Sequence, residues 1–182
     1  MAAGVEPLVV WINGAFGVGK TAVAEELVRL LPYAVLFDPE SLGVVLRDVV
    51  PMDEQTRDFQ DIPAWRATTL AAVVSLARSR AGVVVVPMTL VDSGYFEEIV
   101  GGVRRAGVRL LHVSLAAPGD VIAARLMARS GDERWGLDRI DACVAAIVGE
   151  QFGEHVDATD ATPLDLAERI RAMVSAHEDV PS

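Results

Sequence analysis

Lysine and cysteine are scarce in this sequence, with one residue of each type. Lys20 is the single lysine among 16 basic residues, so arginine carries nearly all of the positive charge. Cys143 is the single cysteine, which excludes an internal disulfide and agrees with a reducing, cytoplasmic compartment. With 26 acidic residues and a net charge of −10, the chain lacks the basic surface that general nucleic-acid binding requires.

Long apolar runs are also missing. No run approaches the roughly 18 residues of a membrane span, and the longest strand-like run, residues 83–91, contains Pro87. The first residues carry no basic cluster, so no signal peptide is expected. The 182 residues fit one domain, 1–182, and 52% of them are hydrophobic, which suits a buried parallel sheet.

The lone lysine stands in a phosphate-binding pattern. Residues 14–21 read G-x-x-x-x-G-K-T, with an apolar strand before them and an amphipathic helix after them. Glycines let backbone N–H groups point at a phosphate, and a compact ammonium reaches where a planar guanidinium would not fit. The alternative, a glycine-rich turn with a lysine by chance, would not be expected to have this strand and helix on either side. The predicted nucleotide-binding residues are Gly14, Ala15, Phe16, Gly17, Val18, Gly19, Lys20 and Thr21, and the Thr21 hydroxyl is expected to hold Mg²⁺.

Apolar strands and amphipathic helices alternate along the chain, which predicts an α/β domain with a mostly parallel sheet. In such sheets ligands bind beyond the carboxyl ends of the strands, so the residues that follow each strand are the candidates for a site. Strands are expected at 7–13, 34–38, 82–88, 108–116 and 155–158. Helices are expected at 20–31, 40–49, 63–80, 93–106, 118–129, 138–150 and 163–176, with a polar connection at 51–62.

Several stretches resemble the tunicamycin-resistance protein family of P-loop ATP-binding proteins. They are WINGAFGVGKT (11–21), FDPESLGVVLR (37–47), DFQDIPAWRA (58–67), VVPMTL (85–90) and the run from 138 to 155. The layout is more distantly similar to shikimate, nucleoside-monophosphate and chloramphenicol kinases. That wider group implies a P-loop fold with five strands in the order 2-3-1-4-5 and helices on both faces. The family implies ATP and an antibiotic-like or nucleoside-like ligand, and leaves open whether a phosphate is transferred.

Asp38 follows the second expected strand, about 10 Å from the P-loop if two strand spacings separate them. A carboxylate there can take the proton of an attacking hydroxyl, which makes Asp38 a candidate base and acceptor-binding residue. The alternative is a helix cap, which Pro39 supports. Glu40 is either a further acceptor-side residue, acting through water on Mg²⁺, or a first-turn acid that complements the helix dipole.

The third expected strand ends without the acidic residue that P-loop NTPases place there. Thr89, in the stretch that follows, is a candidate acceptor-binding residue. Mg²⁺ is then expected on Thr21, phosphates and waters, with Asp38 or Asp92 assisting at a distance. The guanine-reading motif NKxD is excluded because Asn13 and Lys20 are the only residues of their types, so adenine is the expected base.

Two arginines and a tryptophan border the presumed acceptor pocket. Arg47 and Arg66 are candidates for gripping an anionic or polyhydroxylated ligand, and Trp65 for stacking on a ring. The alternatives are solvated arginines and a core tryptophan.

Arg125 and Arg129 share one face of the helix expected after the fourth strand. Resemblance to kinases of this layout implies that an arginine here packs against adenine. Residues 130–139 follow and suggest a lid, whose Arg134 and Arg139 are candidates for contact with the transferring phosphoryl group. An exposed polar connection is the alternative.

These patterns favour an ATP-dependent phosphotransferase that acts on an antibiotic-like or nucleoside-like small molecule. An ATP-bound protein that sequesters a drug with little or no transfer is the alternative, and a regulatory ATPase is a third, weaker one. Asp38 favours the first, and the missing acid after the third strand favours the second.

Overall fold

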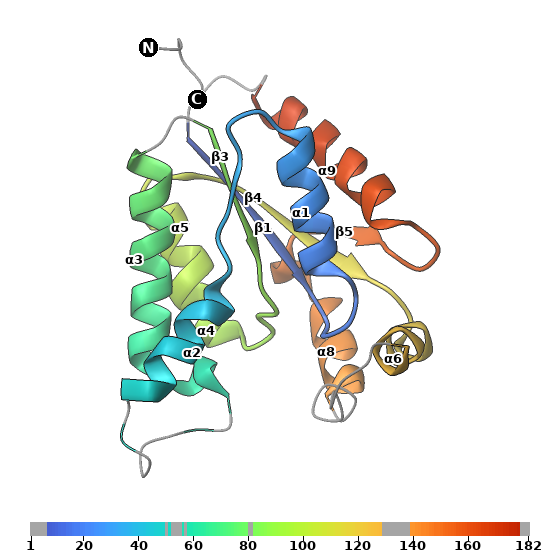
Figure 1. Cartoon of the computed structure of the whole chain (residues 1–182), viewed down its shortest axis with the longest axis horizontal. Coiled ribbons are helices and arrows are strands. Elements are labelled where there is room, and N and C mark those ends of the chain that lie inside the picture. The colour runs from blue at the N-terminus through green and yellow to red at the C-terminus, as the bar shows by residue number, and fades with distance from the viewer. Residues whose placement is uncertain are drawn as a thin grey trace.

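The computed structural model of the chain describes residues 7–49, 51, 56, 58–79, 82–128 and 139–178. Its sheet has five strands in the order β2-β3-β1-β4-β5, and every strand pair is parallel. The sheet confirms the predicted fold class and strand order (Figure 1). The strands are β1 (Leu8–Gly14), β2 (Val35–Leu36), β3 (Val83–Pro87), β4 (Arg109–Ala116) and β5 (Glu154–Asp157).

β1 is the central strand, and all seven of its residues are buried. Its register places Leu8 beside Val83 of β3 on one side and beside Arg109 of β4 on the other. A strand that is covered on both faces reads as a continuous apolar run rather than an alternating one, which is the pattern of LVVWI.

Helices cover both faces of the sheet (Figure 1). On one face, α1 (Lys20–Leu30) and α9 (Pro163–Glu178) pack on Leu8, Val10 and Ile12. On the other, α3 (Pro63–Ser79) packs on Val9 and Trp11. The second face also carries α4 (Ser93–Phe96), the π-helical segment η2 (Glu97–Gly101) and α5 (Gly102–Arg105). The remaining helices are α2 (Pro39–Val49), η1 (Phe59–Asp61), α6 (Gly119–Met127), α8 (Ile140–Ile147) and η3 (Glu150–Phe152).

The structure departs from the expected elements in three places. The helix expected at 93–106 contains a π-helical segment that ends at the Gly101–Gly102 pair, whose helix propensity is low. β2 has two residues instead of five, although the Phe37 N–H still donates to Val85 O at 2.9 Å. The polar connection contains η1, which Asp58 caps by accepting from the Gln60 N–H.

The parallel strands bring their carboxyl ends to one edge of the sheet. The P-loop follows β1 at this edge, α2 follows β2, and residues 88–92 follow β3. The candidate residues after these strands are therefore gathered at one edge, as expected. Arg129 and residues 130–138 of the predicted lid, with Arg134, lie outside the described residues, whereas Arg139 is described.

Candidate functional site

The P-loop backbone forms a cradle at the start of α1. Gly14, Gly17 and Gly19 have φ angles of 144°, 82° and 110°, a region that side chains disfavour. A Cβ at Gly17 would lie 2.5 Å from Leu126 Cγ, so this position excludes a side chain on space as well. Nothing lies within 4 Å of the Cβ position of Gly19, which leaves open space beside the helix N-terminus. The cradle therefore fits the phosphates of a nucleotide.

Lys20 is the first residue of α1, and its side chain folds back into the loop. Only 8% of the residue is exposed. The Nζ donates to Gly14 O at 3.0 Å and to Ala15 O at 2.9 Å, and lies 5.6 Å from the centroid of the Phe16 ring. The ammonium thus occupies the interior of the predicted phosphate cradle, and the neighbouring Thr21 is exposed.

Two buried polar side chains tie the P-loop to the segment that follows β3. The Asn13 Nδ2 donates to Leu90 O at 2.9 Å, and its Oδ1 accepts from the N–H groups of Gly14 and Leu90. The Thr89 hydroxyl donates to Gly14 O at 2.9 Å. The sequence analysis missed this role of Asn13, since a single buried amide carries no local signal, and placed Thr89 only on the acceptor side.

A cavity of about 410 Å³ borders the P-loop on the side of α6 and α9. Arg125 lines it and donates to Val18 O, Ala158 O and Thr159 O at 3.3, 2.7 and 2.8 Å. These bonds fix the guanidinium at the wall where an adenine contact is predicted, and the contact itself stays a prediction. The lining comprises Gly17, Val18, Gly19, Ala22, Val23, Arg125, Ala128, Ala161, Pro163 and Leu166.

A second cavity, of about 230 Å³, borders the P-loop through Phe16. Thr89 lines it, and its predicted contact with an acceptor stays a prediction. The sequence pattern did not single out four other polar residues of this lining, Asp58, Gln60, Asp61 and Tyr95. Only the resemblance pointed to the DFQD run, because nothing in its local pattern shows that it folds onto the P-loop. The lining comprises Phe16, Asp58, Gln60, Asp61, Thr89, Val91, Asp92, Tyr95, Arg139, Ala142 and Cys143.

Two residues of this lining, Arg139 and Asp58, form an ion pair. The Arg139 Nη1 lies 2.6 Å from Asp58 Oδ2, and the Arg139 guanidinium also lies 5.8 Å from the centroid of the Phe16 ring. Burial raises the pKa of the Cys143 thiol, against the positive charges of Arg139 and Lys20, which lower it. The charges of Arg139, Lys20 and Asp58 thus all affect the pKa of the Cys143 thiol, which lies in the cavity lining.

Asp38 caps α2 in the structure. Its Oδ1 accepts from the Glu40 N–H at 2.9 Å, and its backbone carbonyl accepts from the Ser41 hydroxyl at 2.6 Å. Among the described residues, Asp38 does not line the 230 Å³ cavity. Partial removal from water, followed by repulsion from Asp38, raises the pKa of Glu40, which the positive charge of Lys20 lowers. Glu40 therefore lies close enough to the P-loop lysine for its pKa to be affected by that charge.

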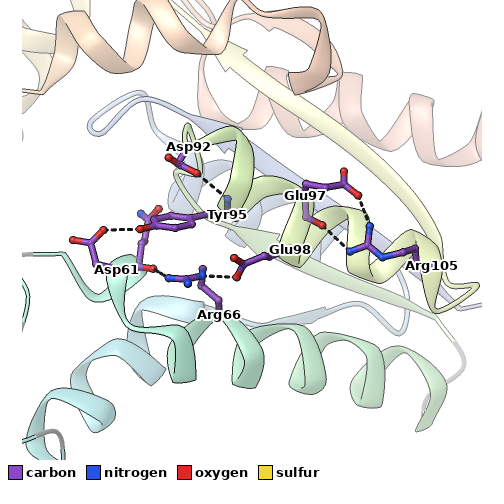
Figure 2. A network of polar contacts seen from close by, with 8 residues as sticks. Asp61, Arg66, Asp92, Tyr95, Glu97, Glu98 and Arg105 are labelled. Carbon is purple, nitrogen blue, oxygen red and sulfur yellow. Dashed lines mark hydrogen bonds and ion pairs between the residues drawn. The ribbon is translucent and has the colours of Figure 1, made fainter. Parts of the chain in front are cut away.

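Arg66 supports one wall of the second cavity (Figure 2). Its Nε lies 2.5 Å from Glu98 Oε2, its Nη1 donates to Gln60 O at 2.6 Å, and its guanidinium lies 4.2 Å from the Tyr95 ring centroid. The Tyr95 hydroxyl donates to Asp61 Oδ1 at 3.0 Å. Arg66 thus holds other side chains of the wall and is not itself part of the cavity lining among the described residues.

Trp65 and Arg47, both predicted to contact a ligand, lie in different surroundings. Trp65 is fully buried and its Nε1 donates to Pro39 O at 2.9 Å, so its ring belongs to the core. Arg47 is exposed on α2, with its guanidinium 5.5 Å from the Phe59 ring centroid. The alternative of a core tryptophan therefore describes Trp65, whereas the predicted ligand contact of Arg47 stays a prediction.

The described residues contain no group of three or more His, Cys, Asp or Glu side chains that could hold a metal ion. The exposed Thr21 hydroxyl beside Lys20 fits Mg²⁺ only together with phosphate oxygens and water. Within the part of the chain that the structure describes, no helix is long and apolar enough to cross a membrane.

Solved structures with a similar fold include that of a tunicamycin resistance protein. The structure from Deinococcus radiodurans is 29% identical, with a TM-score of 0.78, over 92% of this chain and 95% of that chain. This similarity confirms the resemblance that the sequence motifs indicate.

Two kinases share the fold at lower identity. A gluconokinase from Sinorhizobium meliloti 1021 is 20% identical, with a TM-score of 0.62, over 96% of this chain and 93% of that chain. An APS kinase from Mycobacterium tuberculosis, in complex with AMPPNP and APS, is 16% identical, with a TM-score of 0.61, over 94% of this chain and 99% of that chain. No curated protein sequence matches the chain. The sequence profile of a family described as an AAA domain matches residues 9–150, and the chain therefore belongs to this AAA domain family.

Proposed function

We propose that the protein is an ATP-dependent phosphotransferase that acts on a hydroxyl group of an antibiotic-like or nucleoside-like small molecule. One observation carries the proposal: among the described residues, the P-loop, with Lys20 inside it, borders the 410 Å³ cavity through Gly17–Gly19 and the 230 Å³ cavity through Phe16. A kinase needs this arrangement because the γ-phosphate must lie between the nucleotide and its acceptor.

The nucleotide is proposed to lie along the 410 Å³ cavity, with its base near Arg125 and Pro163. Its β- and γ-phosphates would enter the open space at Gly19. Lys20 would exchange the carbonyls of Gly14 and Ala15 for phosphate oxygens, and Thr21 would bind Mg²⁺ together with those phosphates and water. When bound, Mg²⁺ offsets the charge that develops on the transferring group.

The acceptor is proposed to lie in the 230 Å³ cavity, within reach of Thr89 and of Arg139. Asp38 and Glu40 remain candidates for acceptor binding at its P-loop end. A ligand related to tunicamycin is a first choice because the Deinococcus radiodurans protein bears that name. We further propose that the chain works as a single domain in the cytoplasm, where ATP is supplied.

One observation favours the alternative of an ATP-bound protein that sequesters a drug and transfers little. Thr89 follows β3, where P-loop NTPases place a metal-assisting acid. The Thr89 hydroxyl already donates a hydrogen bond to Gly14 O. A weakly held Mg²⁺ would slow transfer while leaving binding intact.

Mass spectrometry separates the two functions. The protein is incubated with Mg-ATP and with tunicamycin, uridine or gluconate as probes of three acceptor types. The gain of one phosphoryl group by a probe supports the kinase. Binding of a probe by calorimetry, without such a gain, supports sequestration.

A further inference from the structure

Among the described residues that line the 230 Å³ cavity, Asp58 is the buried carboxylate. The residue is 8% exposed, whereas Asp61 and Asp92 in the same lining are exposed. We infer that Asp58, and not Asp38, takes the proton of the acceptor hydroxyl, and that Arg139 holds Asp58 until a phosphate draws Arg139 away. This inference rests on the proposed kinase function.

Both oxygens of Asp58 have defined partners. Oδ1 accepts from the Gln60 N–H at 3.0 Å, which orients the carboxylate as a cap of η1. Oδ2 accepts from Arg139 at 2.6 Å. Only the bond to Oδ1 comes from the neighbouring backbone, two residues away. Oδ2 is therefore the oxygen that becomes available if Arg139 changes partner.

Arg139 is placed to make that change. Its side chain is 41% exposed, whereas that of Asp58 is 11% exposed, so the arginine is the more accessible member of the pair. Arg139 and Lys20 both lie within 6 Å of the centroid of the same P-loop ring, that of Phe16. A guanidinium beside the P-loop is attracted by the charge of a γ-phosphate, and it can bind a phosphate through two N–H groups at once.

The exchange matters for the chemistry. A carboxylate paired with arginine is a poor proton acceptor because the positive charge stabilises its ionised form. When Arg139 moves to the phosphoryl group, Asp58 Oδ2 can bind the acceptor hydroxyl. The acceptor oxygen then bonds to the γ-phosphorus, the bond from that phosphorus to the β–γ bridging oxygen breaks, ADP leaves, and the hydroxyl proton passes to Asp58.

Asp38 is a weaker candidate on the same criteria. Its Oδ1 caps α2, and the residue is absent from the described lining of the cavity. The two carboxylates can be separated by Asp58→Asn and Asp38→Asn, because asparagine caps nearly as well as aspartate but does not take the proton. Asp48→Asn is the matched control, since Asp48 is exposed on α2 and is not among the described residues that line either cavity.

The experiment measures transfer from ATP to tunicamycin, uridine and gluconate, and ATP affinity by calorimetry, for the wild type and the three variants. We expect Asp58→Asn to lower the transfer rate by about 10²–10⁴-fold, the range typical of the loss of a general base. Its ATP affinity should equal or exceed that of the wild type, because Arg139 is released. Asp38→Asn should lose less transfer than Asp58→Asn, and Asp48→Asn should match the wild type.

Undiminished transfer by Asp58→Asn, or a larger loss in Asp38→Asn, overturns the inference and leaves the proposed function intact. A wild type that binds ATP but transfers phosphate to none of the probes overturns both. Weaker ATP binding by Asp58→Asn contradicts the exchange of Arg139.

Discussion

The Thr89 hydroxyl donates a 2.9 Å hydrogen bond to the carbonyl of Gly14, 75 residues earlier in the chain. The same carbonyl accepts from the Lys20 ammonium at 3.0 Å. One backbone oxygen therefore joins the P-loop lysine to the segment that follows β3. When phosphates draw Lys20 away, Thr89 is the partner that still holds this oxygen.

Thr89→Val should destabilise the fold by about 1 kcal/mol, the net value of a typical hydrogen bond, because valine keeps the shape and removes the donor. Urea unfolding measures the change. Thr68→Val, on the exposed face of α3, is the control and should leave the midpoint nearly unchanged. Equal midpoints for Thr89→Val and the wild type would show that the bond does not hold the loop.

Lys20→Arg should weaken ATP binding by about 10–100-fold, the equivalent of 1.5–3 kcal/mol for hydrogen bonds to a charged group. Charge is preserved, but a planar guanidinium does not fit the space between Gly14 O, Ala15 O and the Phe16 ring. Calorimetry with ATP tests this. Affinity equal to that of the wild type would mean that the loop does not require an ammonium.

ATP should bind more tightly than GTP, by about tenfold or more, which corresponds to about 1.4 kcal/mol. The residues that read guanine in the NKxD motif are absent from the sequence, and the wall near Arg125 offers Ala161 and Pro163 instead. Competition against a fluorescent ATP analogue measures the ratio. Equal displacement by the two nucleotides argues against an adenine site here.

His112 should make the protein sensitive to acid. Burial in β4, with Arg104 and His155 nearby, lowers its pKa from 6.5 to about 3, and neither ring nitrogen has a hydrogen-bond partner among the described residues. Between pH 6.5 and about 3, His112 binds a proton in the unfolded chain but not in the folded chain. The free energy of unfolding therefore falls with decreasing pH, by up to about 1.4 kcal/mol per unit from this group, until the pH approaches 3.

His112→Phe should remove this part of the pH dependence, since phenylalanine does not titrate and packs beside Phe96 as the imidazole does. Urea unfolding of the wild type and the variant at pH 4, 5, 6 and 7 gives the comparison. The two curves should lie closest together at neutral pH and separate in favour of the variant as the pH falls. Parallel curves would show that His112 is protonated in the folded protein.

The fold and the P-loop were predictable because their signals are local. A G-x-x-x-x-G-K-T run between an apolar strand and a helix specifies the loop in eight residues, and the alternation of strands and helices specifies the sheet. The strand order was available through resemblance alone, since spacing does not say which strands are neighbours.

The acceptor side was less predictable because its contacts are distant in the chain. Asp58 and Arg139 are 81 residues apart, and Gln60 donates to Thr89 O 29 residues away. Only packing brings them together. Trp65 shows the converse difficulty: the sequence does not say whether an aromatic ring stacks on a ligand or fills the core, and here the ring is fully buried.

Transfer of the γ-phosphate tests the central claim most directly. The protein is incubated with Mg²⁺ and ATP labelled on the γ-phosphate, with tunicamycin, uridine or gluconate, and the label is followed into acceptor, inorganic phosphate and remaining ATP. The account predicts labelled acceptor in one-to-one proportion with ADP, and none with Lys20→Ala. Label that stays in ATP while a probe is bound, or that appears only as inorganic phosphate, would contradict it.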